Sequence, residues 1–319
     1  MVPFSYRSQT GALTSVLRRL FEGLLTAWAA VSVTFVALRL AVGDPLAGLL
    51  SRGLATPDQI ESLRKALGLD APLTVQYIRF LIGFLRGDLG TSIYSRRPVS
   101  TVIVEQLPAT IELALAGLTI AIVLGLVIGI LAAWRERRFA GQIATALAGL
   151  GTALPVAFTG VLVLLVFRFG FYRFPNARTL PIQRLLFPAL VLGFASGGAI
   201  ARVVHAGLRE SLNEPYILAA RARGVYGGFH LLWHALKPAL PPVISMSALE
   251  ASFLLSGTVV TETVFSRPGL GRLLVDSILV GDYPIAQGIV AVVAIIYTLS
   301  HIIADLLSAA IDPRLRRWS

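Results

Sequence analysis

Two carboxylates lie in one of the most apolar parts of the chain, where an ionised side chain needs a physical explanation. Glu250 and Glu262 fall within, or at the end of, an apolar segment from about residue 241 to 265. Ionising a carboxylate in hydrocarbon is costly, so such a side chain faces a cavity or a protein partner rather than lipid. Both residues are therefore candidates to line a pathway or a gate. The alternative is an interhelical hydrogen bond or a capped helix end.

No catalytic signature accompanies these carboxylates. A phosphate-binding loop needs Gly-Lys followed by Ser or Thr, whereas the only lysines, Lys65 and Lys237, precede alanine and proline. The hydrolase patterns GxSxG and HExxH do not occur. His230 and His234 are four residues apart, but no third ligand is evident, so a structural role is favoured. We expect no catalytic residue, no metal site and no other cofactor, and any use of ATP must rest with a partner.

The longest polar interruption in the second half of the chain runs from residue 214 to 242. It predicts two short helices. The first is capped by Asn213, has Pro215 just inside its start and is ended by Gly224 in the left-handed conformation. The second runs from about Gly228 to Lys237. The prolines at 238, 241 and 242 then mark the start of the next apolar segment.

The first of these helices is too short and too basic to span a membrane. Ala219, Ala220 and Ala222 carry almost no side chain, so another surface can approach the backbone closely. Arg221 and Arg223 offer guanidinium groups to carboxylates or carbonyls on that surface. The alternative is a cytoplasmic loop that is basic only because such loops generally are.

The composition is that of a polytopic membrane protein. Hydrophobic residues make up 55% of the chain and charged residues 14%, which excludes an ordinary soluble domain. The apolar segments predict an all-α protein with six transmembrane helices, at about residues 20–42, 109–134, 143–167, 185–204, 241–265 and 284–307. Pro155 predicts a kink in the third. Gly125, Gly129 and Ala133 in the second have the spacing that lets helices approach closely.

The net charge is +11, and the basic residues lie between the apolar segments. We therefore expect membrane lipids and acidic protein grooves as partners, and no nucleic acid. Arginines near the segment ends place both termini and the 206–240 loop in the cytoplasm. The arginine-rich loop at 168–184 fits this orientation badly. The chain has no cysteine, which excludes disulfides.

Four parts follow from this organisation. Residues 1–42 hold an N-terminal tail and the first transmembrane helix, and residues 43–108 form an extracytoplasmic insertion. Within it, Thr56 and Gln59 resemble a capping box that opens a helix to Leu67, closed by Gly68. A second helix is expected from about 70 to 85. Residues 109–311 form the core with its 206–240 loop, and residues 312–319 a cytoplasmic tail.

Several motifs occur in register with one family. The Tyr216–Gly224 segment has the form YxxxARAxG, and Leu240-Pro241 follows well downstream. The insertion carries GDP at 43–45, LGLDAPL at 67–73, Gln76-Tyr77, GDLGTS at 87–92 and Val99; VVTETVFSRPGLG spans 259–271, and Asp-Pro-Arg closes the chain at 312–314. Together these resemble the permeases of dipeptide, oligopeptide and nickel ABC importers over nearly the whole chain.

The resemblance implies a type I ABC importer permease fold and a transporter subunit that is not itself an enzyme. Its expected partners are a second homologous permease, two cytoplasmic ABC ATPases and an extracytoplasmic solute-binding protein. The residues implied to couple to the ATPases are Tyr216, Ala219, Ala220, Arg221, Ala222, Arg223 and Gly224. Glu262 lies in the motif at the outer end of its helix. The implied solutes are di- or oligopeptides, with nickel or oligosaccharides as alternatives.

Two other classes remain to be compared with this prediction. An intramembrane hydrolase would need a paired catalytic constellation, which the sequence lacks. A secondary transporter driven by an ion gradient would show inverted repeats and buried charges at mid-membrane. No repeat is visible and Glu250 is the only good candidate for such a charge. Transport in vesicles without ATP would favour this alternative.

Overall fold

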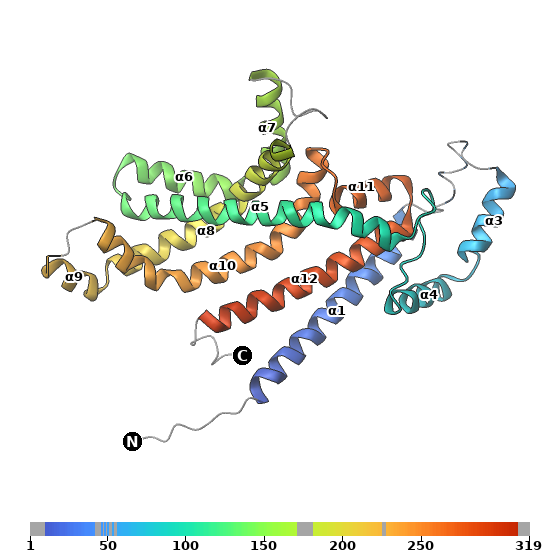
Figure 1. Ribbon diagram of the computed structural model, residues 1–319, viewed down its shortest axis with the longest axis horizontal. Helices are drawn as coiled ribbons and strands as arrows, with labels where there is room; N and C mark the ends of the chain where they lie inside the picture. Colours follow the sequence, from blue (N-terminus) through green and yellow to red (C-terminus); the bar gives the residue numbers. More distant parts are fainter. Residues whose placement is uncertain are drawn as a thin grey trace. The chain divides into compact units, whose positions relative to one another are not determined.

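The computed structural model describes residues 10–41, 46, 48, 50, 53, 56–170, 181–224 and 228–311. Within these residues the secondary structure is helical apart from one isolated bridge between Thr91 and Pro98. The helices, labelled in Figure 1, are α1 (Thr10–Ala41), α3 (Pro57–Leu67), α4 (Leu73–Leu85), α5 (Val99–Trp134), α6 (Phe139–Ala153), α7 (Val156–Gly170), α8 (Pro181–Leu212), α9 (Pro215–Ala222), α10 (Gly228–Val264), α11 (Leu270–Val280) and α12 (Tyr283–Ile311).

The chain divides into two compact units, which we describe separately. The first, which we call the insertion unit, consists of residues 20–110 and 268–298. The second, which we call the core unit, consists of residues 1–19, 111–267 and 299–319. Five helices are long and apolar enough to cross a membrane: Phe21–Leu40, Val99–Trp134, Arg184–Leu212, Leu232–Val264 and Tyr283–Ala304. A bent pair, α6 with α7, brings the number to as many as six, in agreement with the six predicted spans.

The bend between α6 and α7 measures 110°, and it lies at the predicted proline (Figure 1). Leu154 has an extended backbone, with φ −84° and ψ 128°. A residue before proline is pushed out of the helical region, and Pro155 itself has no N–H to continue the helix. The expected kink is therefore a complete break, and two helices replace the single segment that the sequence predicts.

In the core unit, small residues bring α5 and α8 into direct backbone contact, as their spacing predicts. A Cβ added at Gly125 would lie 2.6 Å from Ile200 Cγ2, and one added at Gly129 would lie 2.5 Å from Val204 Cβ. Neither position has room for a side chain. Helix α8 also packs against α6, α7 and α10, so it is the central helix of this unit.

Two predictions for the residue 213–242 segment are wrong. Asn213 does not cap α9, because its side-chain amide donates to the Arg209 carbonyl at 2.8 Å and the helix begins at Pro215. The prolines do not begin a new helix either: α10 runs without interruption from Gly228 to Val264, with all three prolines inside it. Buried Ala235, Ala239 and Val243 hold this part of α10 in place despite the missing N–H donors.

In the insertion unit, the helix from Pro57 to Leu67 and the helix from Leu73 to Leu85 form as the sequence predicts. Thr56 and Gln59 make a reciprocal capping box at the start of α3, and Gly68 ends the helix with φ 64°. The GDLGTS segment is fixed by Asp282, just before α12: its carboxylate accepts from Ser92 Oγ at 2.5 Å and from the Ile93 backbone N–H at 3.1 Å. Helix α11 was not predicted from the sequence.

Candidate functional site

Helix α9 is a short helix with one side fixed in the core unit. Its Ile217 is fully buried and packs in a cluster that includes Leu208 of α8 and Ala235 and Val243 of α10. Ala220, one turn later, is 8% exposed. Residues three apart share a helix face, so Ile217 and Ala220 define the face that the fold itself covers.

The other described residues of α9 near its two ends and along its outer side are exposed, and two of them are alanines. Tyr216 is 41% exposed, and Ala219, Ala222 and Arg223 are exposed too. These positions follow one another at helical spacing. The Arg223 side chain lies back along the helix, where its Nε donates to the Ala219 carbonyl at 3.3 Å. The described residues of this outer side are thus two alanines, with a polar aromatic group at one end and a cation at the other.

The predicted set of coupling residues is therefore split between two faces. Ala220 faces inward and cannot admit a partner without repacking the core unit, contrary to the close approach expected of it. Gly224 has φ 85° and open space around its Cα, which confirms the left-handed helix end. The Arg221 side chain lies outside the described residues.

The two predicted pathway carboxylates are both buried on α10. Glu250 is 8% exposed and its carboxyl group hydrogen-bonds to the Ser196 side chain of α8. Glu262 is fully buried, and its backbone carbonyl accepts from the Arg267 N–H at 2.9 Å. An interhelical hydrogen bond is the alternative that the sequence left open for such a residue, and a pathway or gate role for either carboxylate stays a prediction.

One charged pair near the end of α10 was missed by the sequence reasoning. Arg267 is 9% exposed, and its Nη2 donates to Glu112 Oε2 of α5 at 2.6 Å. Glu112 is 57% exposed, so the pair joins a buried cation to a carboxylate at the surface. Its members are 155 positions apart in sequence. The only local signal was an arginine inside the VFSRPGLG motif.

The described residues hold no group of three or more His, Asp or Glu side chains that could bind a metal ion. Arg97, just before the span in α5, pairs with Glu105 at the start of that helix, and the pKa of Arg97 is raised because its guanidinium donates a hydrogen bond to this carboxylate. Neither this ion pair nor the pair of Arg267 and Glu112 combines a nucleophile with a base. Among the described residues these arrangements are packed helices, an exposed short helix and ion pairs.

Comparison with known proteins identifies the family. Residues 125–317 match the binding-protein-dependent transport system inner membrane component, and residues 12–114 match the N-terminal membrane component of the same systems. The chain belongs to this family. It is 36% identical to the glutathione transport system permease protein GsiC of Salmonella paratyphi A over 304 residues, 95% of this chain and 99% of that protein. The Escherichia coli K12 protein of the same name is 35% identical over the same shares.

A solved structure shares the fold. A chain in a crystal structure of an amino acid ABC transporter with histidines aligns with a TM-score of 0.53 and 17% identity, covering 66% of this chain and 94% of that one. This likeness and the family match confirm the predicted class: an all-α, multi-pass inner-membrane permease of a binding-protein-dependent ABC importer. The chain is a transporter subunit and not an enzyme, and ATP hydrolysis belongs to partner subunits.

The family implies a substrate-binding protein, ATPase subunits and a second permease as partners. Several motif residues that first suggested the family lie outside the described residues, namely 43–45 and 312–314. The middle of the arginine-rich loop, residues 171–180, lies outside them as well.

Proposed function

We propose that this permease imports short peptide-like solutes, with glutathione as the first compound to test. The support comes from relatives of 35–36% identity over nearly the full chain, which are named as glutathione transport permeases. Nickel and oligosaccharides are the alternative solutes. The chain would form the pathway with a second, homologous permease, and an extracytoplasmic binding protein would deliver the solute.

The observation that carries the mechanism is the two-sided character of α9. Its inner face is held by Ile217 and Ala220, and the described residues of its outer face, two of them alanines, are exposed. We infer that the outer face docks in a groove of a cytoplasmic ATPase, with Tyr216, Ala219, Ala222 and Arg223 in contact and Gly224 ending the helix. Because the inner face is packed against α8 and α10, a displacement of α9 would move those helices with it.

The orientation belongs to the same proposal. More arginines flank the predicted inner ends of the spans than the short outer loops, which supports an orientation with both termini and the loop that contains α9 in the cytoplasm. Two ATPases, one for each permease, would then bind the same membrane side. ATP binding draws the ATPases together, and the permeases shift from an inward-open to an outward-open packing.

The roles of Glu250 and Glu262 as pathway or gate residues are also proposals. Both are buried in the arrangement described above, so a change of helix packing would have to expose them to the solute. Glu250→Gln keeps a hydrogen-bonding partner for Ser196 and removes the negative charge. We expect lower uptake from an assembled Glu250→Gln transporter, whereas unchanged uptake would reduce Glu250 to an interhelical contact.

Uptake by reconstituted transporter tests the solute. Proteoliposomes that contain both permeases, the ATPases and the binding protein are supplied with labelled glutathione, a dipeptide, Ni²⁺ or an oligosaccharide. The proposal expects ATP-dependent uptake of glutathione or the dipeptide. Uptake of only Ni²⁺ or the oligosaccharide would contradict the peptide assignment, and uptake without ATP would favour an ion-driven transporter.

A pair of tryptophan variants tests the docking face. Ala219→Trp places a large ring on the exposed face of α9, and Ala140→Trp places the same ring at an exposed position on α6. We expect Ala219→Trp to lose ATPase subunits during purification while Ala140→Trp retains them. Full retention and normal uptake in Ala219→Trp would count against the docking role.

A further inference from the structure

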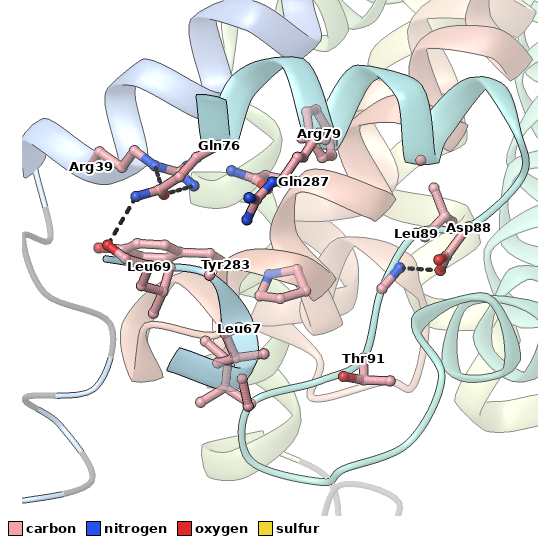
Figure 2. Close-up of a pocket in the computed structure, with 17 residues that line it drawn as sticks. Arg39, Leu67, Leu69, Gln76, Arg79, Asp88, Leu89, Thr91, Tyr283 and Gln287 are labelled. Atoms are coloured by element: carbon pink, nitrogen blue, oxygen red, sulfur yellow. Dashed lines mark hydrogen bonds between the residues drawn. The ribbon is translucent and has the colours of Figure 1, made fainter. Parts of the chain in front are cut away.

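A polar pocket of about 360 Å³ lies in the insertion unit, at the ends of two transmembrane spans. Arg39 lines it from the next-to-last position of the span in α1, and Tyr283 and Gln287 line it from the start of α12. Helix α4 and the loop after α3 complete the wall. The pocket is therefore at the rim of the membrane, where hydrocarbon gives way to headgroups. We call it the rim pocket (Figure 2).

The rim pocket is rich in hydrogen-bond donors. Arg39 uses three of its five N–H groups, two on Gln76 Oε1 at 3.0 and 3.3 Å and one on the Phe35 carbonyl at 3.3 Å. Arg79 has no hydrogen-bond or ion-pair partner among the residues that the structure describes. The one acidic side chain of the lining, Asp88, already accepts from the Gly90 N–H at 2.9 Å.

Gln287 is the observation that points to a missing ligand. It is 5% exposed, and its Nε2 has no hydrogen-bond partner among the described residues. A buried donor without a partner destabilises a fold unless something binds it. Figure 2 shows Arg79 and Gln287 directed into the same part of the rim pocket. Gly68 permits this position of Arg79, since an added Cβ there would lie 2.6 Å from Arg79 Nη1.

Helix α4 places the rim pocket against lipid. It packs along the last two turns of the α1 span: Ser32 Oγ lies 2.5 Å from Tyr77 Oη, and the Phe35 ring contacts those of Tyr77 and Phe80 at centroid distances of 5.2 and 6.0 Å. Helix α4 thus lies at membrane depth rather than in free solution.

The two sides of α4 differ in the way expected of a helix at a membrane interface. Its pocket side carries Gln76, Arg79 and Gly83. Another side exposes large apolar residues that the insertion unit does not cover: Val75, Ile78, Ile82 and Leu85. An interfacial helix buries such a face at the boundary of headgroups and acyl chains. A ligand that satisfies both sides has a phosphate for the donors and hydrocarbon for the apolar face.

We propose that the rim pocket binds the phosphate of a membrane phospholipid, held by Arg39, Arg79 and the Gln287 amide, with the acyl chains along the exposed face of α4. Guanidinium groups match the geometry of phosphate oxygens. The charged side chains of the lining are Arg39, Arg79 and Asp88, which together carry one net positive charge. One phosphodiester group carries the single negative charge that would neutralise it. The lipid would pin the insertion unit to the membrane rim, and this role is independent of which solute the transporter carries.

The test is photo-cross-linking of lipid to the complete transporter in nanodiscs. One probe is a phospholipid with a diazirine near its glycerol, and the matched probe is a diacylglycerol with the same chains and diazirine but no phosphate. Mass spectrometry maps adducts on the peptide that contains α4. We expect the phospholipid to label this peptide and the diacylglycerol to label it about tenfold less, equivalent to about 1.4 kcal/mol. Equal labelling by both probes would overturn the phosphate site.

Three variants locate the donors. Arg79→Gln should lower phospholipid labelling about tenfold, whereas Arg86→Gln, the same change at an exposed arginine outside the pocket, should leave it unchanged. Gln287→Met keeps the size of this buried side chain and removes an amide that has no hydrogen-bond partner among the described residues. The yield of assembled transporter should therefore equal that of wild type, while phospholipid labelling falls. Unchanged labelling in Arg79→Gln or Gln287→Met, or an equal fall in Arg86→Gln, would refute the pocket.

Excess inorganic phosphate separates the two possible sources of the anion. The proposal expects no protection of α4 by soluble phosphate, because the acyl chains contribute to binding. Protection by inorganic phosphate would make the rim pocket a site for a soluble anion and would contradict the lipid assignment.

Discussion

Replacing Asp282 by alanine should release the GDLGTS segment from the start of α12. The Asp282 carboxylate is 3% exposed and accepts from Ser92 Oγ and the Ile93 N–H, both of which belong to buried residues. Asp282→Ala leaves these two donors unpaired in the insertion unit. Each unpaired buried donor is worth about 1–3 kcal/mol, and water that enters the vacated space recovers part of this. We expect about 3 kcal/mol of local destabilisation.

Hydrogen–deuterium exchange on the assembled transporter measures this effect. A loss of 3 kcal/mol raises the population of the opened segment about 100-fold, so amides of the peptide around Ile93 should exchange about that much faster. Asp276→Ala is the control. Asp276 forms a surface pair with Arg272 at 3.5 Å, and such pairs contribute about 0–1 kcal/mol. We expect the control to exchange within about threefold of wild type. Exchange equally close to wild type in Asp282→Ala would refute the claim that Asp282 holds the GDLGTS segment in place.

Three further substitutions test the packing, the charged pair and the capping box. Gly129→Ala should destabilise the α5–α8 contact by about 1–3 kcal/mol and lower the thermal midpoint of the complex, because the added Cβ would lie 2.5 Å from the Val204 Cβ of α8. Gly149→Ala is the control: its added Cβ meets nothing within 4 Å, so the midpoint should not fall. Glu112→Gln should leave Arg267 buried without a charged partner and lower the midpoint by the equivalent of about 1–3 kcal/mol; an unchanged midpoint would mean that the pair contributes nothing. Thr56→Ala should cost α3 about 1 kcal/mol, seen as faster exchange confined to its first turn, and no change there would contradict the capping box.

Local signals in the sequence were sufficient for much of the fold. The capping box of Thr56 and Gln59, the left-handed glycines at 68 and 224 and the change of helix direction at Pro155 are each set by the conformational preferences of a few neighbouring residues. The apolar segments were equally informative, because a membrane span needs about 20 apolar residues in succession. These features could be predicted because their causes lie within one stretch of chain.

The features that were missed or misjudged depend on contacts between distant parts of the chain. Asp282 meets Ser92 across 190 positions, and neither residue shows this in its own surroundings. Helix α10 continues through three prolines because packing of the whole helix outweighs local preference. Helix α9 spans eight residues, too few for its period to reveal that Ala220 faces inward while Ala219 faces out.

Cross-linking from the outer face of α9 tests the central claim most directly. The chain has no cysteine, so Arg223→Cys introduces the only thiol at an exposed position of this face. Ile217→Cys is the matched control on the buried face of the same helix. Each is cross-linked in native membranes and the adduct is identified by mass spectrometry. We predict an adduct between Arg223→Cys and an ABC ATPase subunit, and none from Ile217→Cys. Absence of an ATPase adduct from Arg223→Cys, or its labelling by an impermeant reagent outside intact cells, would contradict the coupling role of α9.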